Sequence, residues 1–101
     1  MIHVIASVTV KEGQRAAFID IFKANVPLVL KEKGCVEYQP AVDVDTPLPP
    51  QQKDPQMVTI IEKWETLEDL YAHLKAPHMA DYQQKVKGMV ENVVLQVMTD
   101  A

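Results

Sequence analysis

The chain has 101 residues, of which 48% are hydrophobic and 24% charged, the composition of one ordinary globular domain spanning residues 1–101. Its formal net charge of −4 repels nucleic acids and anionic membrane surfaces on average, so neither is expected as a partner. The single cysteine, Cys35, excludes an internal disulfide and a thiolate zinc cluster. No signal peptide or membrane-spanning run is recognisable, and a cytoplasmic protein is expected.

The first half of the chain predicts a strand, a helix and a second strand. Apolar residues alternate along Ile2–Val10, as in a strand, and the spacing that follows is helical. Pro27 lacks the N–H that the carbonyl of Lys23 would accept, so a kink or a restart is expected there. Gly34 is expected to cap the end of this helix. Strand character then resumes over residues 35–44.

The second half begins with a long proline-rich loop at 45–56, followed by a clear strand at 57–64. Loops of this length in compact domains tend to be functional or mobile. Thr66 is expected to cap the next helix, and Pro77 suits the first position of a further helix. The last segment, 92–99, is apolar on both sides, so we expect a strand that is covered on both faces.

The order of these elements is β-α-β-β-α-β, which is typical of the ferredoxin-like α+β sandwich. A four-stranded sheet with helices on one face leaves the other face bare. At about 25 cal/mol per Å², exposing roughly a few hundred Å² of apolar sheet costs on the order of several kcal/mol. We therefore expect two copies of the chain to pair sheet to sheet as a homodimer.

The densest group of candidate functional residues lies between Glu62 and His78. Glu62 and Trp64 share a strand face, whereas His73 and His78 lie on the helical segments that should cover the sheet. An indole offers a flat surface for an aromatic ring, and an imidazole accepts a proton near neutral pH. These side chains suit an aromatic substrate with an acidic hydroxyl. The alternative interpretation is structural: a core tryptophan, a histidine on a helix surface and a histidine near a helix start.

A metal site is not expected among these residues. His73 and His78 are five positions apart with a proline between them, so they do not share a helix face, and Glu62 is the only obvious third ligand. On the first strand, His3 and Ser7 are interpreted as structural or interface residues. The chain has only three glycines and no phosphate-binding or dinucleotide loop, which excludes a cofactor held on a Rossmann motif.

Most of the chain resembles the antibiotic biosynthesis monooxygenase family, and within it the bacterial quinol monooxygenase type. The matching stretches are Val26-Pro27 through Glu32-Lys33-Gly34-Cys35 with Tyr38, Ile61-Glu62-Lys63-Trp64-Glu65, Leu70 through Ala72-His73-Leu74, Ala76-Pro77-His78-Met79, and Val86-Lys87-Gly88.

The resemblance implies a dimeric α+β barrel that oxidises a quinol or related aromatic hydroxyl compound with O2, as a cofactor-independent monooxygenase without metal, flavin or haem. His73 or His78 would take the substrate proton, and Trp64 would pack on the substrate ring. The remaining substrate contacts would be Glu62, Tyr82, Tyr71, Phe22 and Ser7.

Two other kinds of relative lead to different expectations. Haem-degrading members carry asparagine, tryptophan and histidine where this chain has Ser7, His73 and Gln83, so haem degradation is not expected. Another relative isomerises a phosphorylated hydroxyketone derived from an autoinducer and shares the histidine pattern. That reaction requires a cationic cradle, for which Lys75 and Lys85 are the candidates. A non-catalytic dimeric module for ligand binding or stress protection is the third interpretation.

Overall fold

The computed structural model describes all 101 residues and contains four strands and three helices. In chain order the elements are β1 (Ile2–Val10), α1 (Arg15–Leu30), β2 (Cys35–Ala41), β3 (Met57–Trp64), α2 (Leu67–Leu74), α3 (Pro77–Val86) and β4 (Val90–Thr99). The predicted ferredoxin-like α+β order is confirmed, with the second helical region divided into α2 and α3. None of the helices is long and apolar enough to cross a membrane.

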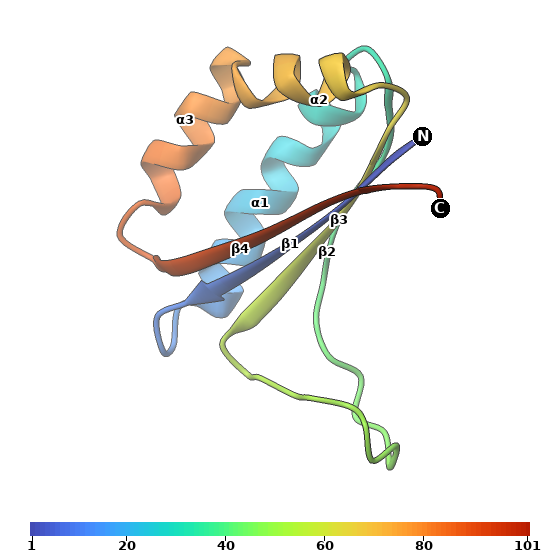
Figure 1. The fold of residues 1–101 in the computed structure, drawn as a ribbon. Coiled ribbons are helices and arrows are strands. Elements are labelled where there is room, and N and C mark those ends of the chain that lie inside the picture. The colour runs from blue at the N-terminus through green and yellow to red at the C-terminus, as the bar shows by residue number, and fades with distance from the viewer.

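The four strands form one antiparallel sheet in the order β2-β3-β1-β4, and the helices gather on one of its faces (Figure 1). In the central register, Ala6 of β1 lies opposite Ile60 of β3 and Leu95 of β4. Side chains on successive residues of a strand point to opposite faces. This register therefore decides which residues of each strand face the helices.

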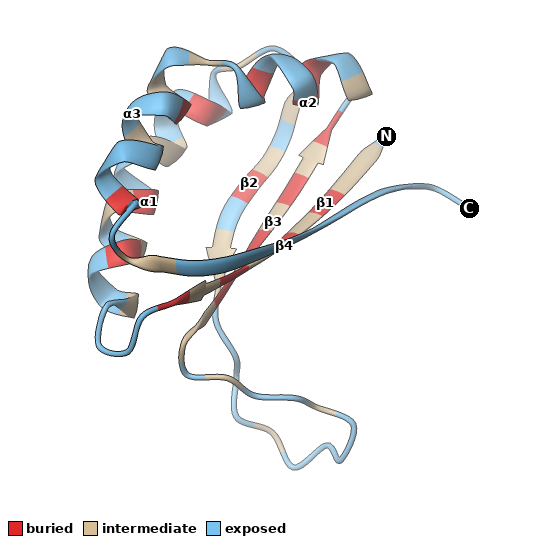
Figure 2. Ribbon diagram, turned by 60° about the vertical axis from the view of Figure 1, so that its left-hand side comes forward, coloured by how far each residue is buried: buried red, intermediate tan, exposed pale blue.

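The core lies between the sheet and α1, where buried residues recur at every second position of β1 and β3 (Figure 2). Phe18, Phe22 and Val29 are the buried residues of α1, and they form the helical side of this core. The predicted helix-facing positions of β3, at Val58, Ile60, Glu62 and Trp64, are all buried. The alternation that predicted the two strands thus also identified the face that each one buries.

The restart expected at Pro27 and the cap expected at Gly34 are both absent from α1. The helix runs without a break through Pro27, which lies on its exposed side. The carbonyl of Lys23, which loses its helical donor there, also belongs to an exposed residue, where water can bond it. Gly34 does not cap the helix, since α1 ends at Leu30 with Lys31 as its cap. Gly34 instead has a φ of +80° in the turn that leads into β2.

The second strand is shorter than expected and ends at Ala41, so the connection to β3 covers residues 42–56. This loop projects from the end of the sheet that lies away from α2 (Figure 1). Internal hydrogen bonds hold it together. The Gln51 side-chain amide donates to the Val44 carbonyl, and the Asp54 N–H donates to the Asp43 carboxylate, each at 2.7 Å.

The last strand departs from expectation in its burial. Residues 91–99 of β4 are exposed within the single chain, as Figure 2 shows, and Val93, Val94 and Leu95 each expose about half of their surface. Leu95 pairs with Ala6 and faces the helices, whereas Val94 pairs with Ser7 on the opposite face. Both faces of β4 therefore present apolar side chains that nothing in one chain covers.

Candidate active site

A cavity of about 580 Å³ opens between the sheet and the helices, and 13 of its 18 lining residues are hydrophobic. Its floor includes Ala6, Ile60 and Leu95 from three neighbouring strands, and α3 forms part of its wall. This volume and apolar lining are typical of a small-molecule site, in which a few polar groups fix the orientation of the ligand.

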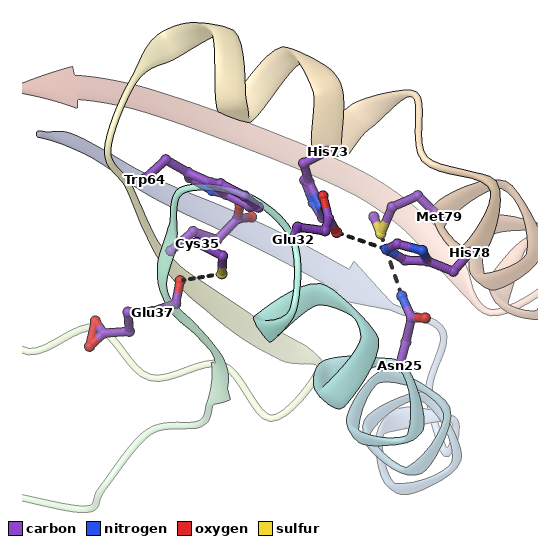
Figure 3. Close-up of polar contacts among 9 residues, drawn as sticks. Asn25, Glu32, Cys35, Glu37, Trp64, His73, His78 and Met79 are labelled. Atoms are coloured by element: carbon purple, nitrogen blue, oxygen red, sulfur yellow. Dashed lines mark hydrogen bonds and ion pairs between the residues drawn. The ribbon is translucent and has the colours of Figure 1, made fainter.

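One carboxylate joins the two histidines beside this cavity. Glu32 Oε2 lies 2.9 Å from His73 Nδ1 and 2.7 Å from His78 Nε2 (Figure 3). The Glu32 side chain retains 14% of its exposure, whereas the His73 side chain retains only 2%. An imidazole N–H donates to a carboxylate oxygen, so the shared oxygen orients both rings at once.

Local sequence signals explain why the histidines meet. Thr66 caps α2 as predicted, because its Oγ1 accepts from the Asp69 N–H at 3.1 Å. Pro77 begins α3 at the predicted position. His73 therefore lies near the end of one helix and His78 near the start of the next, and the turn between the helices aims both rings at Glu32.

His73 is the most enclosed of the ionisable side chains at the cavity. It is 1% exposed, and its ring centroid lies 4.7 Å from that of Trp64 and 5.3 Å from that of Tyr38. With Nδ1 engaged by Glu32, the proton stays on that nitrogen and Nε2 remains an acceptor. Nε2 makes no hydrogen bond within the chain. Every fully buried side-chain nitrogen or oxygen does have a hydrogen-bond partner, so Nε2 is not fully buried. The free nitrogen of this cavity-lining residue is therefore open to the cavity.

Glu62 places a second ionisable group in the cavity wall. It is 8% exposed on β3, and its Oε1 accepts the Trp64 indole N–H at 3.0 Å. Burial raises the pKa of Glu62, and the nearby Glu32 carboxylate adds to the rise, whereas the Trp64 hydrogen bond, and the positive charge of His73 when its ring is protonated, oppose it. The net effect is a raised pKa, so the Glu62 carboxyl holds its proton more readily than a carboxyl in water does.

Aromatic rings line the cavity beside these groups. The Phe22 ring stacks on Tyr38 with centroids 5.0 Å apart and meets Tyr82 edge-on at 5.8 Å. Burial, followed by the nearby charge of Glu62, raises the pKa of both tyrosine hydroxyls far above neutrality. Both phenols therefore keep their protons at neutral pH and can donate hydrogen bonds to a ligand.

The structure brings together part of the predicted site. Four of the predicted residues line the cavity: Glu62, His73, Tyr82 and Phe22. Trp64 is fully buried and does not line the cavity; it packs on His73 instead of presenting a free face to a ligand. His78 lies outside the lining and joins the cluster through Glu32.

Two of the predicted substrate contacts, Tyr71 and Ser7, lie outside the cavity. Tyr71 is 51% exposed and does not line the cavity, because it follows the buried Leu70 and so lies about 100° further around α2. Ser7 lies on the other face of the sheet, since Ala6 and Val8 on either side of it face the cavity. Neither residue belongs to the cavity that His73 lines.

Sequence reasoning missed two functional candidates, Glu32 and Tyr38. Glu32 lies in the turn after α1 and is 41 and 46 residues away from the histidines that it bonds. No periodic pattern marks a turn carboxylate, so only its place in the stretch that resembles the monooxygenase family could have indicated it. Tyr38 is the buried residue of β2, and its position in the same stretch was the only available signal.

The two lysines proposed for an anionic cradle lie outside the cavity. Lys85 pairs with Asp81 one turn earlier on α3 at 3.1 Å, and Lys75 caps the end of α2. Neither lines the cavity, whereas Lys87 at the end of α3 does. No group of three or more histidine, cysteine, aspartate or glutamate side chains is arranged to hold a metal ion.

Comparisons with known proteins place the chain among its relatives. The chain is 40% identical over 100 residues to the protein of Escherichia coli K12 named "Probable quinol monooxygenase YgiN", covering 97% of this chain and 96% of that protein. A solved structure from Nitrosomonas europaea, assigned to the antibiotic biosynthesis monooxygenases, has a TM-score of 0.84 at 20% identity and covers 99% of this chain and 98% of its own.

A second solved structure, protein SO0527 from Shewanella oneidensis, has a TM-score of 0.80 at 26% identity and covers 96% of this chain and 87% of its own. The family model described as antibiotic biosynthesis monooxygenase matches residues 1–85, which carry every residue of the histidine–carboxylate cluster. The protein therefore belongs to the antibiotic biosynthesis monooxygenase family.

Proposed function

We propose that the protein is a quinol monooxygenase that uses O2 and needs no cofactor, with His73 as the base. The observation that carries this proposal is the geometry of His73: Nδ1 is held by Glu32, and Nε2 is open to an apolar cavity. A general base needs a free lone pair and a fixed orientation toward its substrate. The 40% identity to the Escherichia coli quinol monooxygenase supports the same reaction class.

The reaction follows from the chemistry of the substrate. His73 Nε2 removes a hydroxyl proton from the quinol, and the resulting anion is rich enough in electrons to reduce O2 by one electron. The radical pair recombines to a peroxide on a ring carbon that carries hydrogen. Loss of water from this peroxide leaves a hydroxyquinone. The quinol gives up four electrons in all, and O2 places one oxygen atom on the ring and the other in water.

The cavity suits this substrate in several respects. Its apolar floor and the Phe22, Tyr38 and Tyr82 rings can enclose an aromatic ring, while Glu62 can bond a substrate hydroxyl. Excluding water strengthens the electrostatic interactions that stabilise the anion. His78, on the far side of Glu32, supports the orientation of the carboxylate that holds His73.

We infer that the active form is a homodimer, joined through the bare face of the sheet. Val94 and Met98 lie on that face and are 54% and 43% exposed in the single chain. Pairing of two such faces removes apolar surface from water. Cys35 is a free thiol, the normal state of cysteine in the cytoplasm, where we expect the enzyme to act.

Oxygen uptake by metal-stripped protein on a panel of reduced quinones tests the proposed activity. We expect His73→Ala to lower kcat by about 100-fold or more, because the proton acceptor is lost, and His78→Ala to lower it less. Glu68→Ala is the control, since Glu68 is exposed on α2, the helix that also carries His73. Circular dichroism verifies that each variant is folded.

Other outcomes of the same experiment would favour the alternative functions. Absence of uptake by the wild-type protein, with exchange of substrate protons in D2O on a phosphorylated hydroxyketone, would support an isomerase instead. Absence of both activities, with an aromatic ligand still quenching Trp64 fluorescence, would indicate a binding module. Equal activity of His73→Ala and the wild type would remove His73 as the base.

A further inference from the structure

The cavity contains a buried carboxyl group that the deprotonation step does not use. Glu62 is 8% exposed, lines the cavity, and has one oxygen engaged by the Trp64 indole N–H. Its other oxygen makes no hydrogen bond within the chain. Every fully buried side-chain nitrogen or oxygen does have a hydrogen-bond partner, so this oxygen is not fully buried. That oxygen is therefore open to the cavity, on the sheet side, across from the helix that carries His73.

We propose that Glu62 is the acid of the second half of the reaction, protonating the ring peroxide and then accepting the ring proton as water leaves. This inference rests on the proposed quinol monooxygenase function. The hydrogen bond from Trp64 holds one oxygen of the carboxyl, which leaves the other available to a ligand in the cavity that Glu62 and His73 both line.

The surroundings of Glu62 suit a carboxyl that exchanges protons. Two charged groups shift its pKa, Glu32 in the turn after α1 and His73 on α2. The charge of Glu62 in turn raises the pKa of the groups that face it from β2 and α3, which are Cys35, Tyr38 and Tyr82. Burial and the Glu32 charge favour the neutral acid. Protonation of His73, which follows the first step, favours the carboxylate. The first proton transfer therefore prepares Glu62 to release its own proton.

The proton balance closes over one turnover. His73 takes the hydroxyl proton, and the Glu62 carboxyl gives its proton to the peroxide anion on the ring. The Glu62 carboxylate then removes the hydrogen of the peroxide-bearing carbon, whose bonding electrons form the new carbonyl as the O–O bond breaks. The departing hydroxide takes the proton held by His73 and leaves as water. His73 ends neutral and Glu62 ends protonated, as both began.

Glu62→Gln tests this role, because an amide oxygen can still accept the Trp64 hydrogen bond but the side chain can neither give nor take the proton. We expect kcat to fall about 100-fold, with little change in KM. We also expect release of hydrogen peroxide in place of part of the product, since an unprotonated ring peroxide can dissociate. Glu65→Gln is the matched control, as Glu65 is exposed just after β3.

Wild-type protein offers a second measurement that needs no variant. We expect the fraction of consumed O2 that appears as hydrogen peroxide to rise with pH, as Glu62 loses its proton before the peroxide forms. A pH-independent fraction would overturn the proposal. An unchanged kcat in Glu62→Gln, or a loss expressed only as a higher KM, would also overturn it while leaving the quinol monooxygenase function intact. Inactivity of the wild-type protein on every quinol would instead refute the proposed function itself.

Discussion

At the residue scale, Glu32 is the group on which the geometry of the site depends. One of its oxygens bonds both His73 Nδ1 and His78 Nε2, so a single carboxylate orients two rings carried by different helices. Such a partner holds the histidine tautomer and supports the imidazolium that forms when the ring takes a proton. We therefore regard Glu32 as a positioning residue for His73.

Glu32→Gln should lower kcat by about 10- to 100-fold, because a neutral amide holds the Nδ1 proton of His73 less firmly. The fraction of His73 protonated at Nδ1 should fall, and ¹⁵N NMR of the imidazole measures it. Glu32→Asp should recover part of the activity, and Glu37→Gln on β2 serves as the control. An unchanged tautomer would show that Glu32 does not orient His73.

Gly34 packs directly against Asp69, and the contact leaves no room for a side chain at position 34. A Cβ added at Gly34 would lie 2.0 Å from Asp69 Oδ2, and the φ of +80° is unfavourable for any other residue. Asp69 is a buried residue of α2 and its N–H is held by Thr66, so it has little freedom to retreat. The turn before β2 and the first turn of α2 therefore pack together only because residue 34 has no side chain.

Gly34→Ala should lower the free energy of unfolding by about 2 kcal/mol or more, since backbone strain and a steric clash add. Gly13→Ala separates the two effects, because Gly13 has the same φ of +80° but nothing within 4 Å of the added Cβ. That control should lose only about 1 kcal/mol. Urea denaturation measures both, and equal losses would show that Asp69 moves aside freely.

At the element scale, α2 links the sheet to the active site. It begins directly after β3, carries Thr66 at its cap and holds His73 over the cavity. An eight-residue helix has little stability of its own, so its cap and its packing must hold it in place. The position of the base therefore depends on the start of this helix.

Thr66→Ala should lower the free energy of unfolding by about 1 kcal/mol, because the Asp69 N–H loses its acceptor. Thr66→Ser keeps the hydroxyl and should retain most of the wild-type stability. Thermal and urea unfolding followed by circular dichroism compare the three proteins. A serine variant as unstable as the alanine variant would attribute the loss to the threonine methyl group instead of the cap.

At the scale of the whole molecule, one face of the sheet is left uncovered within the single chain. The helices cover only one face of the sheet, and β4 is exposed along most of its length (Figure 2). Its exposed residues include apolar side chains on both faces. The bare face carries Ile5 and Ile61 beside Val94. Sheet-to-sheet pairing of two chains would bury this surface, and it would leave the cavity on the helical side of each subunit.

Light scattering coupled to size exclusion should give about twice the chain mass of 11.4 kDa. Val94→Lys should convert this species to monomers, because a buried unpaired charge is costly. Leu28→Lys, on the exposed side of α1, should leave the dimer intact. A wild-type monomer at micromolar concentration, or a Val94→Lys dimer as stable as wild type, would rule out pairing through this face.

Local patterns in the sequence sufficed for most of the fold. Alternation predicted β1 and β3 together with the faces that they bury, and Thr66 and Pro77 predicted where two helices begin. These features depend on side chains a few residues apart, which is why they can be recognised without coordinates. Pro27 is the exception, because helical packing and solvent at Lys23 outweighed the local preference for a break.

The site depended on contacts that no local pattern encodes. His73 and Glu62 could be named from their types and neighbours, but Glu32 meets its histidines across 41 and 46 residues of sequence. Glu32 meets the two histidines only because the turn after α1 packs against α2 and α3 in the folded chain. The same crossing decides that Trp64 packs on His73 and that Tyr71 points outward. Residue chemistry is therefore local information, whereas the alignment of a base with its carboxylate is a property of the packed chain.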